Sequence, residues 1–383
     1  MLQSKSRSWV EIDLQKVKDN YQTMLHHIHK NQKIMAVVKA DCYGHGDAII
    51  AKVLEEQGVD YFAVSSIDEA LNLRHANIKS KILILGYTPN EHFHYLHEYV
   101  ITQCVMSYEY AKSLSEYATL QNTQIEVHIK VDTGMGRIGI PCFDNNYQID
   151  IVKSIYDFDG LSCTGIFSHF SVADTYDSES DMIYTNHQIE LYERVLKDLR
   201  SANITYGLTH IQNSYGAINY PNLDYDYSRV GILLVGSTSN DSQKLKYPVA
   251  LSPSLEWKAN VSCVKTVPEN TYIGYGRNYI TNKKTKIVTV SCGYADGVNR
   301  QASHHHLEVL LHGIRCEIIG NICMDQFMID ATKVANVVSG DVVTIVGSDG
   351  NQTIKIDELS RAANTINNES FCLISKRIPR FYK

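Results

Sequence analysis

The sequence predicts a two-domain α/β protein: an N-terminal (β/α)8 barrel followed by a smaller, mainly β domain. Short apolar runs recur along roughly the first 240 residues, about 20 to 40 residues apart, and most intervals between them have a helix-like pattern. Beyond about residue 245 the helical periodicity weakens, and strand-like runs alternate with Gly, Asn and Asp turns. A chain of 383 residues is long enough for both units.

Eight apolar runs are expected to form the strands of the barrel. Alternation of strand and helix favours a parallel sheet, and eight such units favour its closure. A doubly wound open sheet is the alternative, but the first run lacks the G-x-G-x-x-G turn that is typical of it. The expected strands are Ile34–Ala40, Tyr61–Ser66, Lys81–Thr88, Ile101–Ser107, Ile125–Val131, Cys163–Phe170, Tyr206–Asn213 and Val230–Gly236.

Helical patterns fill the intervals between these runs. The segment "DAIIAKVLEEQG" places Ile49, Val53 and Leu54 on one face and ends at Gly58, and "NHQIELYERVLKDLR" carries a broad apolar stripe. In the second domain, "LEWKANVSCVKTV", "KTKIVTVSCGY" and "GDVVTIVG" are strand-like, and one late helix is expected near "IDELSRAANTIN".

Composition and charge exclude several classes of protein. The net charge of −6 and the absence of a basic block argue against a nucleic-acid partner. Nine scattered cysteines without a C-x-x-C pair indicate neither a zinc cage nor a disulfide framework, and the three histidines of "SHHHLE" are expected in a solvated loop, so no metal site is predicted. No apolar run approaches the ~20 residues of a membrane span. A cytoplasmic location is expected, and a membrane anchor preceding Met1 stays open.

Ionisable and polar residues gather where the predicted strands end, which is where a barrel places its active site. "NS" after the seventh run and "RVGI" at the eighth suit a phosphate, and a lysine across the barrel from them suggests pyridoxal phosphate held as a Schiff base. Each residue alone also fits a structural role, because rim lysines and buried histidines are common; only their conjunction favours a site. The set is Lys39, Tyr43, Lys130, Arg137, His169, His210, Asn213, Ser214, Arg229, Gly231 and Ile232.

Eight ordered motifs resemble those of the bacterial alanine racemases, over nearly the whole chain from Trp9 to Arg380. The resemblance implies a cofactor-binding barrel over residues 12–242 and a β domain over 243–383 that also takes up a strand from residues 1–11. It further implies a homodimer in which each β domain completes the partner's active site. The motifs are "AVVKADCYGHG", "KVDTGMGRIG", "FSHF", "HIQNS", "SRVGI", "YGR", "GYADG" and "GNICMDQ".

The same resemblance implies a role for each site residue. Lys39 matches the lysine that binds pyridoxal phosphate and is one of two acid–base groups, and Tyr275 of the partner subunit matches the other. Arg229 matches the arginine at the pyridine nitrogen, with His210 behind it. The remaining matches are Tyr43, Asn213, Ser214, Gly231 and Ile232 around the cofactor, His169 supporting the tyrosine, Arg137 with the partner's Met324 and Asp325 at the substrate, and Lys130 at a position that is often carbamylated.

One position departs from the family pattern. The family usually reads "TINYE" near its C-terminus, whereas this chain reads "TINNES", with Asn368 in place of the tyrosine. A smaller amide leaves room and a hydrogen-bonding group, which is what serine needs beyond alanine. The asparagine pattern resembles the serine racemases of vancomycin-resistance operons, in which the racemase is the cytosolic half of a membrane protein. The hypothesis is a racemase of serine and alanine that supplies D-amino acids for peptidoglycan; the alternative is an ordinary alanine racemase with a neutral variation.

Two other classes share part of this architecture. Barrel-type pyridoxal-phosphate decarboxylases also use a lysine on the first strand, but they generally place a carboxylate at the pyridine nitrogen, and Arg229 in "SRVGI" argues against them. A non-catalytic cofactor carrier of the single-barrel type lacks the second domain, which accounts for some 140 residues here.

Overall fold

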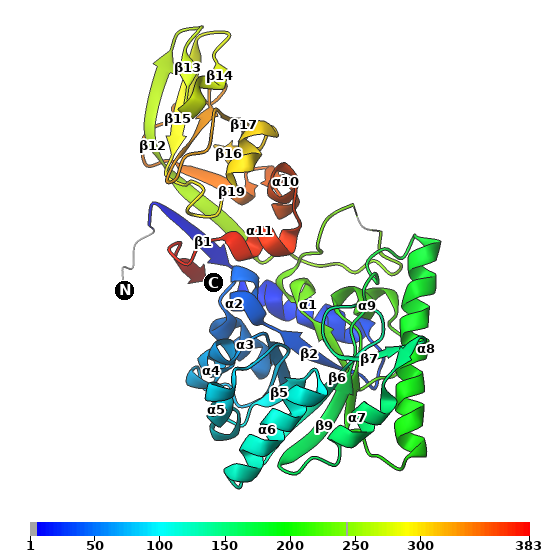
Figure 1. Cartoon of the computed structure of the whole chain (residues 1–383). Coiled ribbons are helices and arrows are strands. Elements are labelled where there is room, and N and C mark those ends of the chain that lie inside the picture. Colours follow the sequence, from blue (N-terminus) through cyan, green and yellow to red (C-terminus); the bar gives the residue numbers. More distant parts are fainter. Residues whose placement is uncertain (1–5, 243) are drawn as a thin grey trace.

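The computed structural model describes residues 6–242 and 244–383, and it contains two domains stacked end to end (Figure 1). One holds a closed parallel sheet surrounded by helices; the other holds a nine-stranded sheet. The predicted fold class is confirmed, because helices alternate with the barrel strands while strands dominate the second domain.

The barrel sheet runs in the order β10-β9-β6-β5-β4-β3-β2-β11, and each neighbouring pair in it is parallel. Backbone hydrogen bonds from Asp226 N to Thr209 O and from Arg229 N to Gln212 O, both 3.0 Å, close it between β10 and β11. The strands are β2 (Lys33–Val37), β3 (Tyr61–Val64), β4 (Lys81–Ile84), β5 (Thr102–Val105), β6 (Ile125–Asp132), β9 (Leu161–Phe167), β10 (Leu208–His210) and β11 (Tyr227–Val230).

Side chains of the barrel strands alternate between two cores. On β2, Ile34 and Ala36 join the large core between sheet and helices, whereas Met35 and Val37 join a small cluster with Tyr61 and other residues of the strands themselves. Burial on both faces is the reason that these strands are continuous apolar runs in the sequence. The interior also contains polar side chains, with His128 and Lys130 of β6 and Arg229 of β11 all buried.

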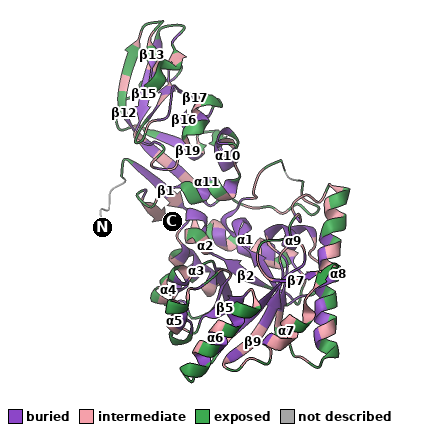
Figure 2. Cartoon of the chain, in the orientation of Figure 1, coloured by how far each residue is buried: buried purple, intermediate pink, exposed green. Residues whose placement is uncertain are grey.

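Helices cover the outside of the barrel, as Figure 2 shows by their buried inner and exposed outer faces. Serine caps start three of them: the hydroxyls of Ser66, Ser107 and Ser178 each accept a backbone N–H of the first turn. The helices are α1 (Leu14–His27), α2 (Lys39–Gly44), α3 (Asp47–Glu56), α4 (Ile67–His75), α5 (Phe93–Glu98), α6 (Tyr108–Leu120), α7 (Ile149–Ile155), α8 (Glu179–Ser201) and α9 (Ser214–Asn219); the shorter elements are η1 (Asn90–His92), η2 (Ile232–Val235), β7 (Ile140–Phe143) and β8 (Asn146–Tyr147).

The eighth strand was predicted at the wrong place. The apolar run Val230–Gly236 is mostly the 3₁₀ helix η2, which packs on α1, and the strand is the preceding segment Tyr227–Val230. That segment contains Ser228, whose hydroxyl donates to Gln32 Oε1 at 2.8 Å, and Arg229, which faces the polar interior. Because of these polar residues, the strand is not an apolar run and was not predicted.

The second sheet takes strands from both ends of the chain. β1 pairs antiparallel with β12 and parallel with β21, and the Trp257 indole donates to the Ser8 hydroxyl at 3.0 Å. Its strands are β1 (Ser8–Ile12), β12 (Leu255–Val267), β15 (Thr285–Val290), β16 (Glu308–Leu311), β17 (Ile314–Ile319), β18 (Phe327–Asp330), β19 (Val342–Asp349), β20 (Gln352–Ile354) and β21 (Arg380–Tyr382); β13 (Tyr272–Ile273) pairs with β14 (Tyr279–Ile280). The exact domain boundaries, 12–242 and 243–383, stay a prediction.

Two helices of this domain, α10 (Ile356–Ala362) and α11 (Asn367–Leu373), lie where it meets the barrel, and α11 packs against α2 (Figure 1). The remaining 3₁₀ turns are η3 (Tyr275–Arg277) and η4 (Arg300–His304). Of the "SHHHLE" histidines, His304 ends η4 and the other two follow it on the surface, where His306 Nδ1 lies 2.5 Å from Glu317 Oε1. Within the described residues, no helix is both long and apolar enough to cross a membrane.

Candidate active site

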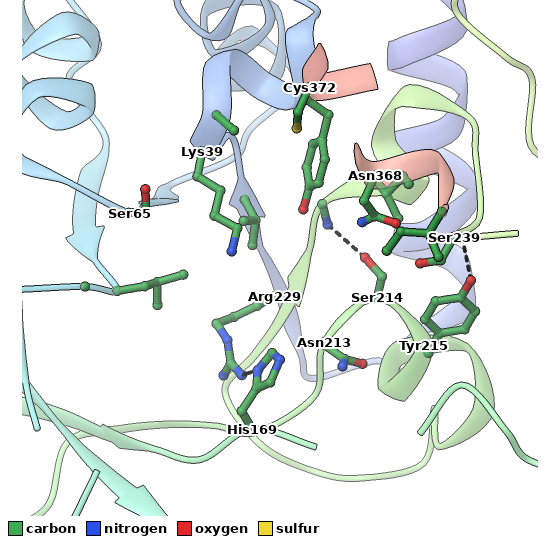
Figure 3. Close-up of a pocket in the computed structure, with 18 of the residues that line it drawn as sticks. Lys39, Ser65, His169, Asn213, Ser214, Tyr215, Arg229, Ser239, Asn368 and Cys372 are labelled. Carbon is green, nitrogen blue, oxygen red and sulfur yellow. Dashed lines mark hydrogen bonds between the residues drawn. The ribbon is translucent and has the colours of Figure 1, made fainter. Parts of the chain in front are cut away.

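A cavity of about 900 Å³ lies at the carboxyl ends of the barrel strands, and α11 of the second domain forms one of its walls. Of the predicted residues, Lys39, Tyr43, Lys130, Arg137, His169, Asn213, Ser214, Arg229, Gly231, Ile232 and Asn368 line it. Figure 3 shows the Lys39 side chain pointing towards Arg229, while Ser214 and Asn368 lie across the cavity from Lys39. The charged side chains of the lining are cationic except for Glu369.

Lys39 begins a turn that is unusual in its backbone. The four residues after it, Ala40 to Tyr43, all have positive φ angles between 49° and 56°, although none is glycine. A left-handed conformation costs about 1–2 kcal/mol for each such residue, so other contacts must hold it. The expected strand Ile34–Ala40 accordingly ends at Val37, before the lysine.

Glu69, on α4, provides one of these contacts. Its carboxylate accepts the backbone N–H of Ala40 at 2.8 Å and that of Ser65 at 2.7 Å. The C-terminal strand provides another, because Arg380 donates to Gly44 O at 3.1 Å and Tyr382 donates its hydroxyl proton to His45 O at 3.1 Å. The turn is therefore clamped from the barrel on one side and from the second domain on the other.

The Lys39 amine itself is not held by hydrogen bonds to the described residues. Among the described residues, none forms a hydrogen bond with its Nζ atom, while burial, with a smaller contribution from the Arg137 guanidinium, lowers its pKa below the usual value. A lysine amine that is partly desolvated and close to another cation gives up its proton more readily, which suits it to react as a nucleophile or a base.

Arg229 is held much more firmly. Its guanidinium is buried and donates to Ser168 O at 2.8 Å and to Ile211 O at 3.0 Å. It also donates to His169 Nδ1 at 2.8 Å and to His210 Nδ1 at 2.7 Å. Burial lowers its pKa to about 10, which still leaves it protonated at neutral pH. A fixed cation therefore faces the cavity.

The two histidines beside Arg229 are neutral. Burial, and secondly the Arg229 charge, lower the pKa of both His169 and His210 well below the usual range. Because Nδ1 of each ring accepts a hydrogen bond from Arg229, the ring proton of each must be on Nε2. His169 lines the cavity, whereas His210 lies behind Arg229 and does not.

A small cup forms on the Ser214 side of the cavity. The Gly231 N–H donates to Ser214 Oγ at 3.0 Å, and a Cβ atom on Gly231 would come within 2.3 Å of the Tyr43 hydroxyl oxygen. Two hydroxyls and a backbone amide thus converge where only glycine leaves space. Asn213 caps the helix that begins at Ser214 by accepting Gly216 N–H at 2.8 Å. These donors fit a phosphate group, and Lys39 and Arg229 face the remaining space.

Lys130 is the second lysine of the cavity. Its Nζ donates to Val131 O at 2.7 Å and lies 5.6 Å from the centre of the Phe167 ring. Burial lowers its pKa to about 7, so a large part of its amine is neutral at physiological pH. Arg137 also lines the cavity.

Asn368 lies on α11 at the mouth of the cavity. Its side-chain Oδ1 atom is buried and has no hydrogen-bond partner among the described residues. A buried carbonyl oxygen without a donor is unfavourable, so this atom has an unused capacity to accept a hydrogen bond.

Three predicted residues lie away from this cavity. Tyr275, in η3, is 72% exposed and lines a different pocket, together with residues of β13, β15 and β18. Met324 is 53% exposed, and Asp325 pairs with Arg377 at 2.5 Å. A single chain therefore does not bring these three residues to Lys39.

Part of the cavity lining was not predicted from the sequence. Phe167 packs between the Lys130 and Arg229 charges and stacks on His210, with ring centres 4.7 Å apart. It stands two positions before His169, so period-two alternation on a strand could have identified it. No sequence signal distinguishes Ser65, Leu85, Tyr215, Ser239, Thr365, Ile366, Glu369 or Cys372, which reach the cavity only through the fold.

The similarity to known proteins extends over nearly the whole chain. Residues 12–239 match the family described as "Alanine racemase, N-terminal domain", and residues 254–382 match "Alanine racemase, C-terminal domain". "Alanine racemase 2" of Caldanaerobacter subterraneus is 41% identical over 97% of this chain and 94% of its own length. "Serine/alanine racemase" of Enterococcus gallinarum is 38% identical over 94% of this chain and 49% of its own length. The solved alanine racemase of Clostridium difficile 630 superposes with a TM-score of 0.91 at 33% identity, covering 100% of this chain and 97% of that one.

Proposed function

Because this chain belongs to the alanine racemase family, whose activity is the interconversion of L- and D-alanine with pyridoxal phosphate, we propose that it also racemises serine. Asn368 carries this proposal, since it lines the cavity and has a buried amide oxygen without a partner. The serine hydroxyl can donate to that oxygen, and asparagine takes less space than the tyrosine that is usual in the family. The 38% identity to a serine/alanine racemase supports the same conclusion.

The cavity suits the cofactor of the family. Pyridoxal phosphate, when bound, supplies an electron-accepting ring that makes the α-proton of an amino acid removable. We propose that Tyr43, Ser214 and the backbone of Gly231 and Ile232 hold its phosphate, and that Lys39 anchors it. Arg229 donates a hydrogen bond to the ring nitrogen without giving up its proton, because a guanidinium stays charged at neutral pH.

Racemisation needs a proton-transferring group on each face of the substrate. Lys39 is the proposed group on one face, and the lowered pKa of its amine helps it to accept the α-proton. The proposed group on the other face is the phenol of Tyr275 of the partner subunit. With its ring proton on Nε2, His169 is in a state to donate a hydrogen bond into the cavity, towards that phenol.

A homodimer follows from the proposed mechanism. Tyr275, Met324 and Asp325 do not line their own chain's cavity, and the first two are exposed. A second copy in head-to-tail arrangement would place them opposite Lys39, with Arg137 and the partner's Met324 and Asp325 around the substrate. Mixing Lys39→Ala and Tyr275→Phe proteins tests this, because one wild-type site per mixed dimer restores activity only if the sites are shared.

The D-amino acids made in this way would supply peptidoglycan precursors, and D-serine would supply those that lower vancomycin binding. We propose that the enzyme acts in the cytoplasm, either by itself or as the cytosolic domain of a longer protein.

A racemisation assay with L-serine, L-alanine and a few larger amino acids tests the substrate. We expect comparable kcat/KM values for serine and alanine, and a fall of roughly tenfold or more in the serine-to-alanine ratio in Asn368→Tyr. Leu373→Tyr is the matched control, because it adds a tyrosine to an exposed position of the same helix outside the cavity. A serine efficiency orders of magnitude below that of alanine, with a ratio unchanged by Asn368→Tyr, would exclude serine as a substrate.

A further inference from the structure

A line of buried hydrogen bonds continues from Arg229 through the barrel interior. His210, which accepts from Arg229 through Nδ1, lies 2.9 Å from His128 Nδ1 through its Nε2. His128 Nε2 lies 3.2 Å from the Tyr61 hydroxyl. Tyr61 donates to Thr102 Oγ1 at 2.9 Å, and Thr102 donates to Glu126 Oε2 at 3.3 Å.

The chemistry at the two ends fixes the direction of every bond. An arginine can only donate, so His210 Nδ1 accepts and His210 carries its proton on Nε2. That proton can bond only to an unprotonated His128 Nδ1, which places the His128 proton on Nε2, facing Tyr61. A carboxylate accepts at the far end. Each donor therefore points from the cation in the site towards Glu126, which pairs with Lys81 at the opposite end of the barrel.

The side chains of the barrel interior pack closely around the His128 ring. His128, His210 and Tyr61 are all at most 1% exposed, and burial lowers the pKa of His128 to about 3, so the ring is neutral and has one proton to place. On the neighbouring strand, a Cβ atom at Gly165 would lie 2.7 Å from two atoms of this ring. Glycine at that position leaves the space that the imidazole fills.

We propose that His128 is a positioning residue, which fixes the tautomer of His210 and thereby the orientation of the Arg229 guanidinium. Without an acceptor at His128, the buried Nε2–H of His210 has no partner, and His210 gains by turning or by moving its proton to Nδ1. An Nδ1–H faces the arginine donor and pushes it away. The effect on turnover rests on the proposed role of Arg229 at the cofactor, whereas the tautomer does not.

Nitrogen-15 NMR of the histidines in the cofactor-free protein tests the tautomer directly, with the His210 signals assigned by their loss in His210→Gln. We expect a protonated Nε2 and an unprotonated Nδ1 in the wild type. His128→Asn, whose amide oxygen replaces Nδ1 as the acceptor, should keep this pattern, and His128→Leu should lose it. A wild-type His210 protonated on Nδ1 would overturn the proposal, whether or not the enzyme racemises any amino acid.

Two tyrosines give a matched pair for turnover. Tyr61 and Tyr227 pack edge to face inside the barrel, 5.7 Å between ring centres, but the Tyr227 hydroxyl donates to Asp60 and not to the line from Arg229. We expect kcat to fall roughly 10- to 100-fold in His128→Leu and several-fold in Tyr61→Phe, with KM little changed. Tyr227→Phe and His128→Asn should stay near wild type. If Tyr61→Phe and His128→Leu match Tyr227→Phe in kcat, the proposal is wrong; if His128→Leu does not fold, the tyrosine pair decides.

Discussion

Lys39 and Arg229 face each other across the same cavity but are held in opposite ways. The lysine is held through its backbone, by a turn with four consecutive positive φ angles and by the Glu69 carboxylate, while its amine makes no hydrogen bond to the described residues. The arginine lies on an ordinary strand and is held through its side chain, by two carbonyl oxygens and two imidazole nitrogens.

The difference matches what each group has to do. A group that takes and returns a proton must move between positions, so the chain fixes where its side chain starts and leaves the amine free. A group that polarises a cofactor ring must stay still, so most of its donors are already paired with protein acceptors, and it needs little reorganisation during the reaction. Substitutions on the two sides should therefore fail in different ways.

The largest effect is expected on the Lys39 side. Lys39→Ala removes the proposed cofactor anchor and one of the two proton-transferring groups, so racemisation of L-alanine should fall by about 10⁴-fold or more. Chiral chromatography of the product measures it. Lys33→Ala is the control, because Lys33 begins the strand that precedes Lys39 and its amine is in an exposed ion pair with Asp60. Substantial racemisation by Lys39→Ala would remove Lys39 from the mechanism.

Arg229→Lys tests whether orientation matters on the other side. The charge is kept, but a lysine cannot serve four acceptors spread around a planar fork. We expect kcat to fall by about 10²-fold, the scale of losing one preorganised donor. Arg200→Lys, on the surface of α8, should be neutral. Activity within a few-fold of wild type would mean that a positive charge alone is sufficient at position 229.

Both Lys39 and Arg229 could be predicted from the sequence, but the contacts that hold them in place could not. Motifs at strand ends identified both Lys39 and Arg229, because chemistry in a barrel collects where parallel strands end. The left-handed turn could not be predicted, since Ala, Asp, Cys and Tyr do not favour positive φ and only tertiary contacts impose it. Glu69 and His128 were missed for a related reason: their partners are distant in the sequence, and each stands in an ordinary helical or strand-like segment. The strand that contains Arg229 was predicted a few residues too late because the strand itself includes the polar residues Ser228 and Arg229.

Glu69→Gln separates the strained turn from the lysine chemistry. The amide replaces one carboxylate oxygen by an N–H donor, so it cannot accept both the Ala40 and the Ser65 backbone protons. We expect the free energy of unfolding in urea to fall by about 1–2 kcal/mol, and kcat to fall about tenfold because Lys39 loses its fixed starting point. Asp68→Asn, one residue earlier in the same helix turn, should cost less than about 1 kcal/mol and leave kcat unchanged. Equal effects of the two substitutions would mean that Glu69 acts only through its charge.

Lys130 is the intermediate case, an amine like Lys39 but buried and hydrogen-bonded like Arg229. Because burial lowers its pKa to about 7, its amine is mostly protonated at about pH 6 and mostly neutral at about pH 8. Only the neutral amine can add carbon dioxide, so we propose that a carbamate forms on Lys130 as the pH rises through 7 and gives Arg137 an anionic partner. In ¹³C-labelled bicarbonate, a carbamate NMR signal should be strong at about pH 8, weak at about pH 6 and absent from Lys130→Arg. The same variant should raise the KM for alanine only a few-fold, since Arg137 itself remains. A protein without the signal at the higher pH would leave Lys130 a neutral lysine, fixed by Val131 O and the Phe167 ring alone.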